Sequence, residues 1–188
     1  LPTIPQFLQK EEEEESVGGA FRGTAYHRVL ELLDFASVTT FEEVEAALRR
    51  FGDERRMDQE SLSLLNPKTI LGFLTSPLGK RMAKAEKEGR LHKEQQFVIG
   101  IPAREMDISD SQELVLIQGI IDAYMEEDGK LVIVDYKTDR VGNGQEQILI
   151  DRYHVQLEYY KRALEQMTGK TVSEKIIYSV ALQKEICL

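Results

Sequence analysis

The chain has 188 residues, 41% of them hydrophobic and 30% charged, which suits one soluble domain with its own core. Its formal net charge of −9 argues against a simple basic module that binds nucleic acid, but leaves room for an enzyme with a local basic surface. The single cysteine, Cys187, excludes an internal disulfide framework and a four-cysteine zinc or iron–sulfur site, and fits a reducing, cytoplasmic setting.

The first residues predict a tether. Two prolines precede an acidic run, Glu11 to Glu15, whose charges repel one another, and Gly18-Gly19 follows. We therefore expect residues 1–17 to be an acidic linker, with a solvated helix start as the alternative, and residues 18–188 to form the domain. Because the chain starts with Leu1-Pro2 rather than Met, we expect it to be part of something longer.

Helical patterns fill the next seventy residues. Thr24 is a plausible N-cap, and Tyr26, Val29, Leu30 and Leu33 recur at helical spacing, which predicts a buried stripe with His27 at its edge. From this segment alone, His27 is more often a half-exposed helix histidine than a ligand. Further helices are expected at residues 41–51, 58–65, 68–74 and 76–87. The basic face of the last helix (Lys80, Arg81, Lys84, Lys87) is expected to be solvated, with phosphate contact as the alternative.

The second half of the chain predicts a sheet. We expect strands at residues 91–101, with Glu94 inside, at 174–182 and at 185–188, and a hairpin between them. A long helix over residues 145–167 should end at Gly169, with Val155, Tyr159 and Leu164 in the core and Gln156 and Tyr160 sharing a face. This order predicts an α/β fold, an α+β sandwich in which helices flank a central mixed β-sheet.

The hairpin carries the chemistry. Two runs rich in Ile and Val flank Asp128-Gly129, a strong signal for a two-residue turn. Counting back from that turn places Asp122 opposite Asp135, with Lys137 on the same face as Asp135. Facing carboxylates repel, a cost most readily accepted when a divalent cation lies between them. The pattern indicates a magnesium site for phosphodiester cleavage, although an Asp-x-Lys at a strand end is more commonly a solvated strand exit.

Three separated motifs occur in order along the chain. They are Gly23-Thr24-Ala25-Tyr26-His27-Arg28-Val29-Leu30-Glu31, then Gly119-Ile120-Ile121-Asp122 with Asp135-Tyr136-Lys137-Thr138-Asp139, then Gln156-Leu157-Glu158-Tyr159-Tyr160. In this order they resemble the RecB-family nucleases of the PD-(D/E)XK superfamily, and particularly the C-terminal nuclease domains of AddA-type helicase–nuclease proteins. The resemblance covers roughly Gly18 to the C-terminus and implies a restriction-endonuclease-like fold.

The resemblance also implies roles for individual residues. His27, Asp122, Asp135 and the backbone carbonyl of Tyr136 match the family's metal ligands. Lys137 matches the catalytic lysine, and Gln156 and Tyr160 match the motif beside the active site. The implied cofactor is Mg²⁺, and Mn²⁺ suits an imidazole ligand better. The superfamily's proline before the first Asp is Ile121 here, a departure that puts little in doubt.

The implied function is that of a metal-dependent DNA exonuclease domain that cuts 3′-terminated single strands during double-strand-break repair by homologous recombination. The implied partners are DNA, the helicase domains of a longer parent and an AddB-type partner protein. This chain has no Walker-type phosphate loop, so ATP use would belong to the parent. The alternatives are a catalytically inactive module that tracks single-stranded DNA or docks a partner, and a stand-alone restriction- or resolvase-type endonuclease.

Overall fold

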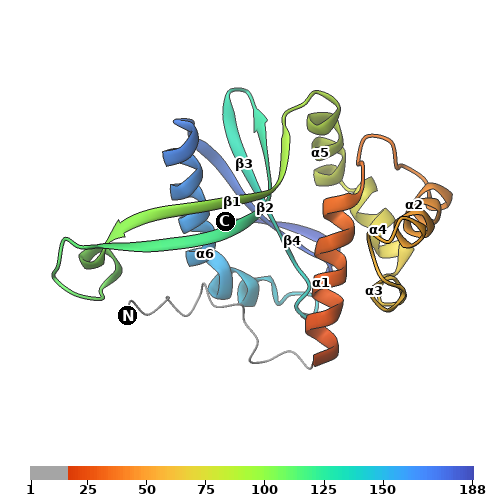
Figure 1. The fold of residues 1–188 in the computed structure, drawn as a ribbon, viewed down its shortest axis with the longest axis horizontal. Helices are drawn as coiled ribbons and strands as arrows, with labels where there is room; N and C mark the ends of the chain where they lie inside the picture. Colours follow the sequence, from red (N-terminus) through yellow and green to blue (C-terminus); the bar gives the residue numbers. More distant parts are fainter. Residues whose placement is uncertain (1–16) are drawn as a thin grey trace.

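A central five-stranded sheet with helices on both faces organises the protein (Figure 1). The structure, a computed structural model, describes residues 17–188, so the predicted linker over residues 1–17 lies almost wholly outside the described residues. The predicted mixed sheet with flanking helices is confirmed. No helix within residues 17–188 is long and apolar enough to cross a membrane.

The described elements follow one another with short connections. The helices and strands are α1 (Val17–Leu32), α2 (Phe41–Asp53), α3 (Gln59–Ser63), α4 (Pro67–Thr75), α5 (Pro77–Lys87), β1 (Leu91–Pro102), the 3₁₀ helix η2 (Ala103–Met106), β2 (Leu114–Glu127), β3 (Lys130–Lys137), α6 (Glu146–Thr168), β4 (Val172–Ser179) and β5 (Lys184–Cys187).

Local signals explain most of the helix boundaries. Thr40 caps α2 by accepting a hydrogen bond from the Glu43 amide, and the Glu43 carboxylate in turn accepts one from the Thr40 amide. Gly169 ends α6 in the left-handed conformation that favours glycine. The predicted Thr24 cap is wrong: α1 already begins at Val17, and the Thr24 hydroxyl donates back to the Ala20 carbonyl inside the helix.

The two faces of the sheet are covered by different helices. The first core lies between the sheet and the block of α1, α2, α4 and α5, and the second lies between the sheet and α6. The predicted stripe on α1 is buried, but Val155 of α6 is 37% exposed, because Tyr153 and Leu157 on either side of it face the sheet instead. The basic face of α5 is partly structural, since Arg81 is hydrogen-bonded to Glu127 and Glu174.

The strand order is β1-β2-β3-β4-β5, antiparallel except for the parallel pair β3–β4, which α6 connects. The predicted turn is confirmed: Asp128 and Gly129 have φ angles of 50° and 74°, and Glu127 pairs with Lys130. The register then runs back to Ala123 opposite Val134.

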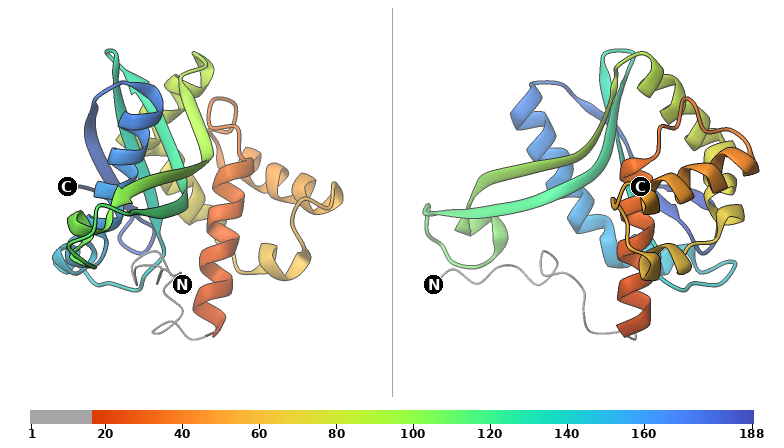
Figure 2. Two further views of the ribbon diagram at one scale, coloured as in Figure 1. Left: turned by 60° about the vertical axis from the view of Figure 1, so that its left-hand side comes forward. Right: turned by 45° about the vertical axis from the view of Figure 1, so that its right-hand side comes forward.

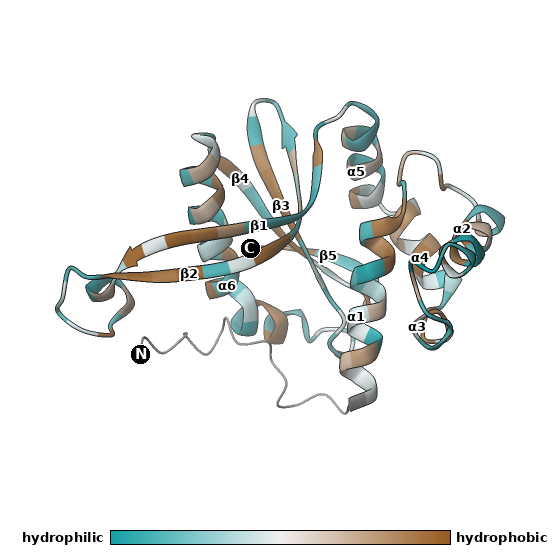
Figure 3. Cartoon of the chain, in the orientation of Figure 1, coloured by the Kyte–Doolittle hydropathy of each residue, from teal (hydrophilic) through white to brown (hydrophobic). Residues whose placement is uncertain are grey.

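Strands β1 and β2 run on beyond β3 as a long two-stranded arm with η2 at its tip (Figures 1 and 2). Figure 3 shows the apolar residues along both strands of the arm. One face of the arm, with Phe97 and Ile117, packs in the core beneath α6. An ion pair of 2.6 Å between Arg162 of α6 and Glu105 of η2 ties the tip to the helix.

Candidate active site

The predicted site residues come from four elements, α1, β2, β3 and α6, and the structure brings most of them together where β2 parts from β3. The paired register ends at Ala123 opposite Val134, so Asp122 and Asp135 occupy the next position. There the Asp122 Oδ2 accepts a hydrogen bond of 2.8 Å from the Tyr136 amide. The carboxylate thus takes the place of a backbone acceptor at the point where the two strands separate.

His27 reaches the same place from α1. Its Nδ1 lies 3.1 Å from the Asp122 Oδ1, and its ring lies edge-on to the Tyr136 ring with centroids 6.1 Å apart. The histidine that the helical pattern left at the edge of a buried stripe therefore contacts the first aspartate of the hairpin. The Asp122 carboxylate therefore contacts α1 through one oxygen and β3 through the other.

Lys137 connects β3 to α6. Its Nζ donates a hydrogen bond of 2.9 Å to the Gln156 Oε1, lies 3.0 Å from the Asp135 Oδ2 and stands 3.9 Å from the centre of the Tyr153 ring. The side chain is 14% exposed and so reaches its partners largely out of contact with solvent. These contacts hold the ammonium beside the Asp135 carboxylate.

Tyr160 lies one turn beyond Gln156 on α6 and is 5% exposed. Its ring meets the ring of Phe97 on β1 edge to face, with centroids 5.6 Å apart. A side chain on Gly119 of β2 would collide with this arrangement, since its Cβ would lie 2.9 Å from the Phe97 ring. The glycine of the Gly-x-x-Asp motif therefore leaves room for the aromatic pair beside the site.

The end of the Asp-Tyr-Lys-Thr-Asp segment fixes both flanking helices. A Cβ on Gly23 of α1 would lie 2.8 Å from the Thr138 Oγ1, so glycine permits the helix to approach β3 closely. On the other side, the Asp139 Oδ2 accepts hydrogen bonds from Arg152 at 2.5 Å and from the Tyr153 hydroxyl at 2.7 Å. The segment thereby sets the positions of His27 on α1 and of the α6 residues together.

Burial and nearby charges shift the pKa values of the two carboxyl groups in opposite directions. Burial would raise the pKa of Asp122, but the charge and hydrogen bond of His27, with Lys137 and the Tyr136 amide, hold it below its usual value. Burial, opposed by Lys137 and reinforced by the Asp122 charge, raises the pKa of Asp135 to about 7. Burial would lower the pKa values of His27 and Lys137, but the carboxylates raise both.

The side chains at this site supply only some of the ligands that a hard divalent cation takes. Within residues 17–188, no three His, Cys, Asp or Glu side chains gather in a group that could hold a metal ion. Two carboxylates do meet, and the Oδ2 atom of the buried Asp135 lies 3.0 Å from the Lys137 Nζ. Magnesium takes oxygen ligands and keeps several waters, so two carboxylates suit it. His27 contacts Asp122 here, and its role as a direct ligand stays a prediction.

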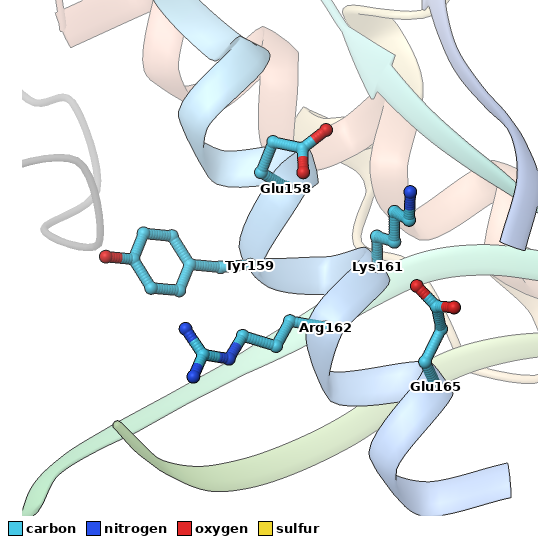
Figure 4. A pocket seen from close by; sticks show the side chains of 5 residues that line it. All are labelled: Glu158, Tyr159, Lys161, Arg162 and Glu165. Atoms are coloured by element: carbon cyan, nitrogen blue, oxygen red, sulfur yellow. The ribbon is translucent and has the colours of Figure 1, made fainter. Parts of the chain in front are cut away.

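A separate hollow of about 620 Å³ lies along α6, lined by Glu158, Tyr159, Lys161, Arg162 and Glu165 (Figure 4). None of these residues is among the predicted site residues. Charges of both signs line the hollow, so it has no strong preference for an anion such as phosphate. We therefore assign the chemistry to the carboxylates at the parting of β2 and β3.

Sequence reasoning missed Tyr153 as a neighbour of the lysine. It precedes Gln156 by three positions and Tyr160 by seven, so all three lie on one face of a helix. That spacing was a usable signal. The apolar residues Val155 and Tyr159 instead predict a different buried face, which the structure shows to be only partly covered.

Comparisons with known proteins identify the family of this chain. A family model described as the PD-(D/E)XK nuclease superfamily matches residues 5–185. Relatives named as the A subunit of an ATP-dependent helicase/nuclease include those of Lachnoclostridium phytofermentans, 40% identical over 98% of this chain, and of Clostridioides difficile, 34% identical over 97%. The relative of this name from Clostridium botulinum strain Alaska E43 is 38% identical over 98% of the chain. The chain spans only 15% to 16% of the length of these relatives.

Proposed function

Because the chain belongs to the PD-(D/E)XK nuclease superfamily, we propose that it is a Mg²⁺-dependent deoxyribonuclease domain that hydrolyses phosphodiester bonds at the Asp122–Asp135–Lys137 site. The single observation that carries the proposal is the buried Asp135 carboxylate, held beside the Asp122 carboxylate with its Oδ2 3.0 Å from the Lys137 Nζ. The mixed five-stranded sheet of this chain, with its flanking helices, is consistent with the fold of this superfamily.

Asp122 and Asp135 would hold the cation, with the backbone carbonyl of Tyr136 as a further oxygen. Bound magnesium or manganese would supply positive charge beside the scissile phosphate and lower the pKa of the attacking water. Lys137, kept protonated by the two carboxylates, orients that water and offsets negative charge on the phosphorane. The Gln156 amide keeps the ammonium in place through its hydrogen bond.

The first role of His27 is to hold the Asp122 side chain in position. The imidazole holds one carboxylate oxygen while the Tyr136 amide holds the other, so the side chain is fixed before a cation arrives. Direct ligation of the cation by His27 would use the other ring nitrogen, Nε2, because Nδ1 contacts Asp122. Manganese suits an imidazole ligand better than magnesium does, so a preference for manganese would favour direct ligation.

For the parent protein, we propose a role in double-strand-break repair by homologous recombination, in which this domain digests 3′-terminated single strands. The support is the similarity, over nearly all of this chain, to relatives whose names place them in an ATP-dependent helicase/nuclease. Helicase domains and an AddB-type protein would then be its partners, and ATP would be used by the helicase part. An inactive binding module is the second candidate, but it would not need the intact pair of aspartates beside a buried lysine.

The test is digestion of matched single-stranded and duplex DNA by the isolated chain, with and without Mg²⁺. We expect magnesium-dependent cleavage of single strands that is lost in Asp135→Ala. Lys130→Ala, which removes an exposed lysine at the turn between β2 and β3, is the matched control and should cut normally. Binding of single-stranded DNA without any cleavage in Mg²⁺ or Mn²⁺ would support the inactive module instead.

A further inference from the structure

One face of the two-stranded arm of β1 and β2 is apolar and open to solvent. Alternate residues of the arm, such as Phe97 and Ile117, pack in the core beneath α6, so the residues between them face away from that helix. The large apolar side chains among these outward residues are 46% to 70% exposed, namely Val98, Leu114, Leu116 and Ile120. We call the surface that these four side chains form the outer face of the arm.

The four side chains form one continuous strip. Val98 of β1 lies opposite Gln118 of β2, so Leu116 and Ile120 are its two diagonal neighbours. Leu114, two residues before Leu116, continues the strip towards the tip of the arm. Soluble proteins rarely leave a contiguous apolar patch open to water, and such patches mark interaction surfaces. The outer face is therefore a candidate docking surface.

The edges of the arm are open as well. β1 is the first strand of the sheet, and β2 pairs with β3 only from Ala123 to Glu127, so within residues 17–188 the two strands of the arm pair only with each other. Backbone groups along an open edge can pair with an added extended segment. The arm therefore offers an extended occupant both apolar contacts and hydrogen bonds.

The charge of the arm argues against DNA as the occupant. Neither Gln95–Pro102 on β1 nor Leu114–Ile121 on β2 contains an Asp, Glu, Lys or Arg residue. DNA binding takes cationic side chains close to the phosphates, and the outer face has none. The occupant must itself be uncharged and apolar, because a charged group buried against this face would lose its water without gaining a partner.

The size of the outer face argues against a second copy of the chain. From Leu114 to Ile120 the strip is roughly 20 Å long, and two strands are roughly 10 Å wide. A stable interface between two proteins takes about 800 Å² from each partner, which is several times this area. A short segment is the occupant that this area suits.

Residues 1–8 of the same chain, which precede the residues that the structure describes, have the chemistry that the outer face requires. Their sequence, Leu-Pro-Thr-Ile-Pro-Gln-Phe-Leu, contains no charged side chain and ends in the apolar pair Phe7-Leu8. Its two prolines favour an extended backbone, because a proline keeps the residue before it out of the helical region. The acidic run Glu11–Glu15 that follows suits water and not this face.

Helix α1 starts at the end of the sheet from which the arm leaves. Gly23 approaches Thr138, just beyond the last residue of β3. Strand β2 is antiparallel to β3 and continues as the arm past that same end. The residues that precede Val17 therefore join the domain at the arm's end of the sheet.

The connection between residues 1–8 and the arm is long enough. His27 of α1 contacts Asp122 at the root of the arm, and α1 begins at Val17, about 15 Å from that contact along the helix axis. Residues 9–16 span up to about 27 Å when extended. They can therefore bring the segment to Ile120, which lies two positions from Asp122 on β2.

We propose that the outer face of the arm is the docking site of residues 1–8 of this chain, with Phe7 and Leu8 packed against Val98, Leu116 and Ile120. Docking removes the apolar strip from water and covers an arm that would otherwise be free to pair with other chains. The contact is independent of the proposed nuclease function, and it can be measured without DNA or metal.

The chain contains no tryptophan, so an introduced tryptophan is a specific reporter. Phe7→Trp places it in the segment, and its emission maximum and its quenching by acrylamide show whether residue 7 is buried. The same measurement is then made with Leu116→Asp added, which places a charge on the outer face. Ile148→Asp is the matched control, because Ile148 is also an exposed apolar residue, 42% exposed, but lies on α6.

We expect the tryptophan of Phe7→Trp to emit at short wavelength and to resist quenching. Adding Leu116→Asp should shift the emission towards that of a tryptophan in water, because losing one buried apolar side chain lowers the docking equilibrium constant about 10-fold or more. Ile148→Asp should leave the emission unchanged. Circular dichroism checks that both substitutions, each of an exposed residue, leave the fold intact.

Three results would overturn the proposal. A tryptophan that is exposed in Phe7→Trp alone would mean that residues 1–8 do not cover the outer face. A tryptophan that stays buried with Leu116→Asp and also with Val98→Asp would place the segment elsewhere on the domain. Emission that changes with protein concentration, together with dimers in sedimentation, would assign the contact to a second copy of the chain.

Discussion

His27 and Asp122 are 95 positions apart in the sequence, and a contact of 3.1 Å between Nδ1 and Oδ1 joins them. The contact fixes α1 to the point where β2 leaves β3. Because the second oxygen of Asp122 accepts from the Tyr136 amide, rotating this carboxylate would break contacts with both elements. The site is therefore rigid on the Asp122 side, and Asp135 is the carboxylate whose environment a cation would change most.

Lys137→Ala should lower the rate of single-strand cleavage by about 100-fold or more while leaving the fold intact, because it removes the positive charge that offsets developing negative charge. The measurement is the initial rate of digestion in saturating Mg²⁺, with circular dichroism to check folding. Lys130→Ala, which removes an exposed lysine at the turn between β2 and β3, is the control. Near-normal cleavage by Lys137→Ala would remove Lys137 from the catalytic role.

Asp135→Asn should stabilise the metal-free protein at pH 8. Burial raises the pKa of Asp135 from 3.8 to about 7, so its favourable contribution is complete below pH 4 and is lost as the pH rises through 7. Asparagine carries no charge, so its advantage in melting temperature should be on the order of 5 °C at pH 8 and should shrink towards pH 4. Thermal unfolding in EDTA across this range checks the prediction.

Mg²⁺ should have different effects on the melting temperatures of the wild type and of Asp135→Asn. It should raise the melting temperature of the wild type at pH 8, because a ligand that binds only the folded state stabilises it. Asp135→Asn should gain little. An equal gain in both proteins would mean that the cation binds elsewhere on the chain.

Gln156→Ala should slow cleavage by about 10- to 100-fold without abolishing metal binding, because the amide positions the Lys137 ammonium rather than the cation. Tyr160→Phe should have a smaller effect in the same direction, since the ring still packs against Phe97. Val155→Ala changes a partly exposed neighbour on the same helix and should leave the rate unchanged. Wild-type rates in both site variants would contradict the proposed role of α6.

Gly23→Ala should destabilise the protein, although alanine is normally the better helix residue by about 1 kcal/mol. The added methyl group would meet the Thr138 Oγ1 at 2.8 Å and force α1 away from β3. Combining it with Thr138→Ala should recover part of the loss, with a coupling free energy of roughly 1 kcal/mol in urea unfolding. Gly18→Ala, whose Cβ would meet nothing within 4 Å, should not destabilise. Strict additivity would show that the two residues do not constrain each other.

The isolated chain should cut single-stranded DNA without ATP and cut duplex DNA poorly, because hydrolysis is downhill and nothing here resembles a phosphate-binding loop for strand separation. Cleavage should weaken as salt is added, since a chain of net charge −9 holds DNA only through a local basic surface. A salt series on matched substrates, with and without ATP, checks this. ATP-dependent cleavage or a preference for blunt duplex would contradict it.

Much of the fold was predictable because short-range signals agreed with the hydrophobic pattern. The Asp128-Gly129 turn determines the register, and the register alone puts Asp122 beside Asp135. The contact with His27 was not derivable from local pattern, since it depends on how α1 packs against the sheet. It was expected only from the resemblance to a nuclease family, and the structure brings the two residues together.

The failures have equally local causes. Val155 looked like core because a helix with apolar residues on two sides permits more than one buried face, and only packing against the sheet selects Tyr153 and Leu157. The predicted start of α1 is too late because Thr24 has the residue type of an N-cap and follows the glycines that end the lead-in, whereas the helix runs through both glycines. Glu94 of β1 has a φ angle of 52°, in the left-handed region, and nothing in the sequence signals this, since glutamate has no preference for positive φ.

The residues of the site lie between positions 27 and 160 of the sequence. They come from α1, β2, β3 and α6, so no pair of elements that are consecutive in the chain holds all of them. Such contacts close large loops, so they form late and slowly compared with helices or the β2–β3 hairpin. A partly folded chain can therefore hold native helices and a native turn without having a nuclease site. Recovery of cleavage after denaturation should follow the slowest folding phase, so the chain acquires the ability to damage DNA only when it is fully folded.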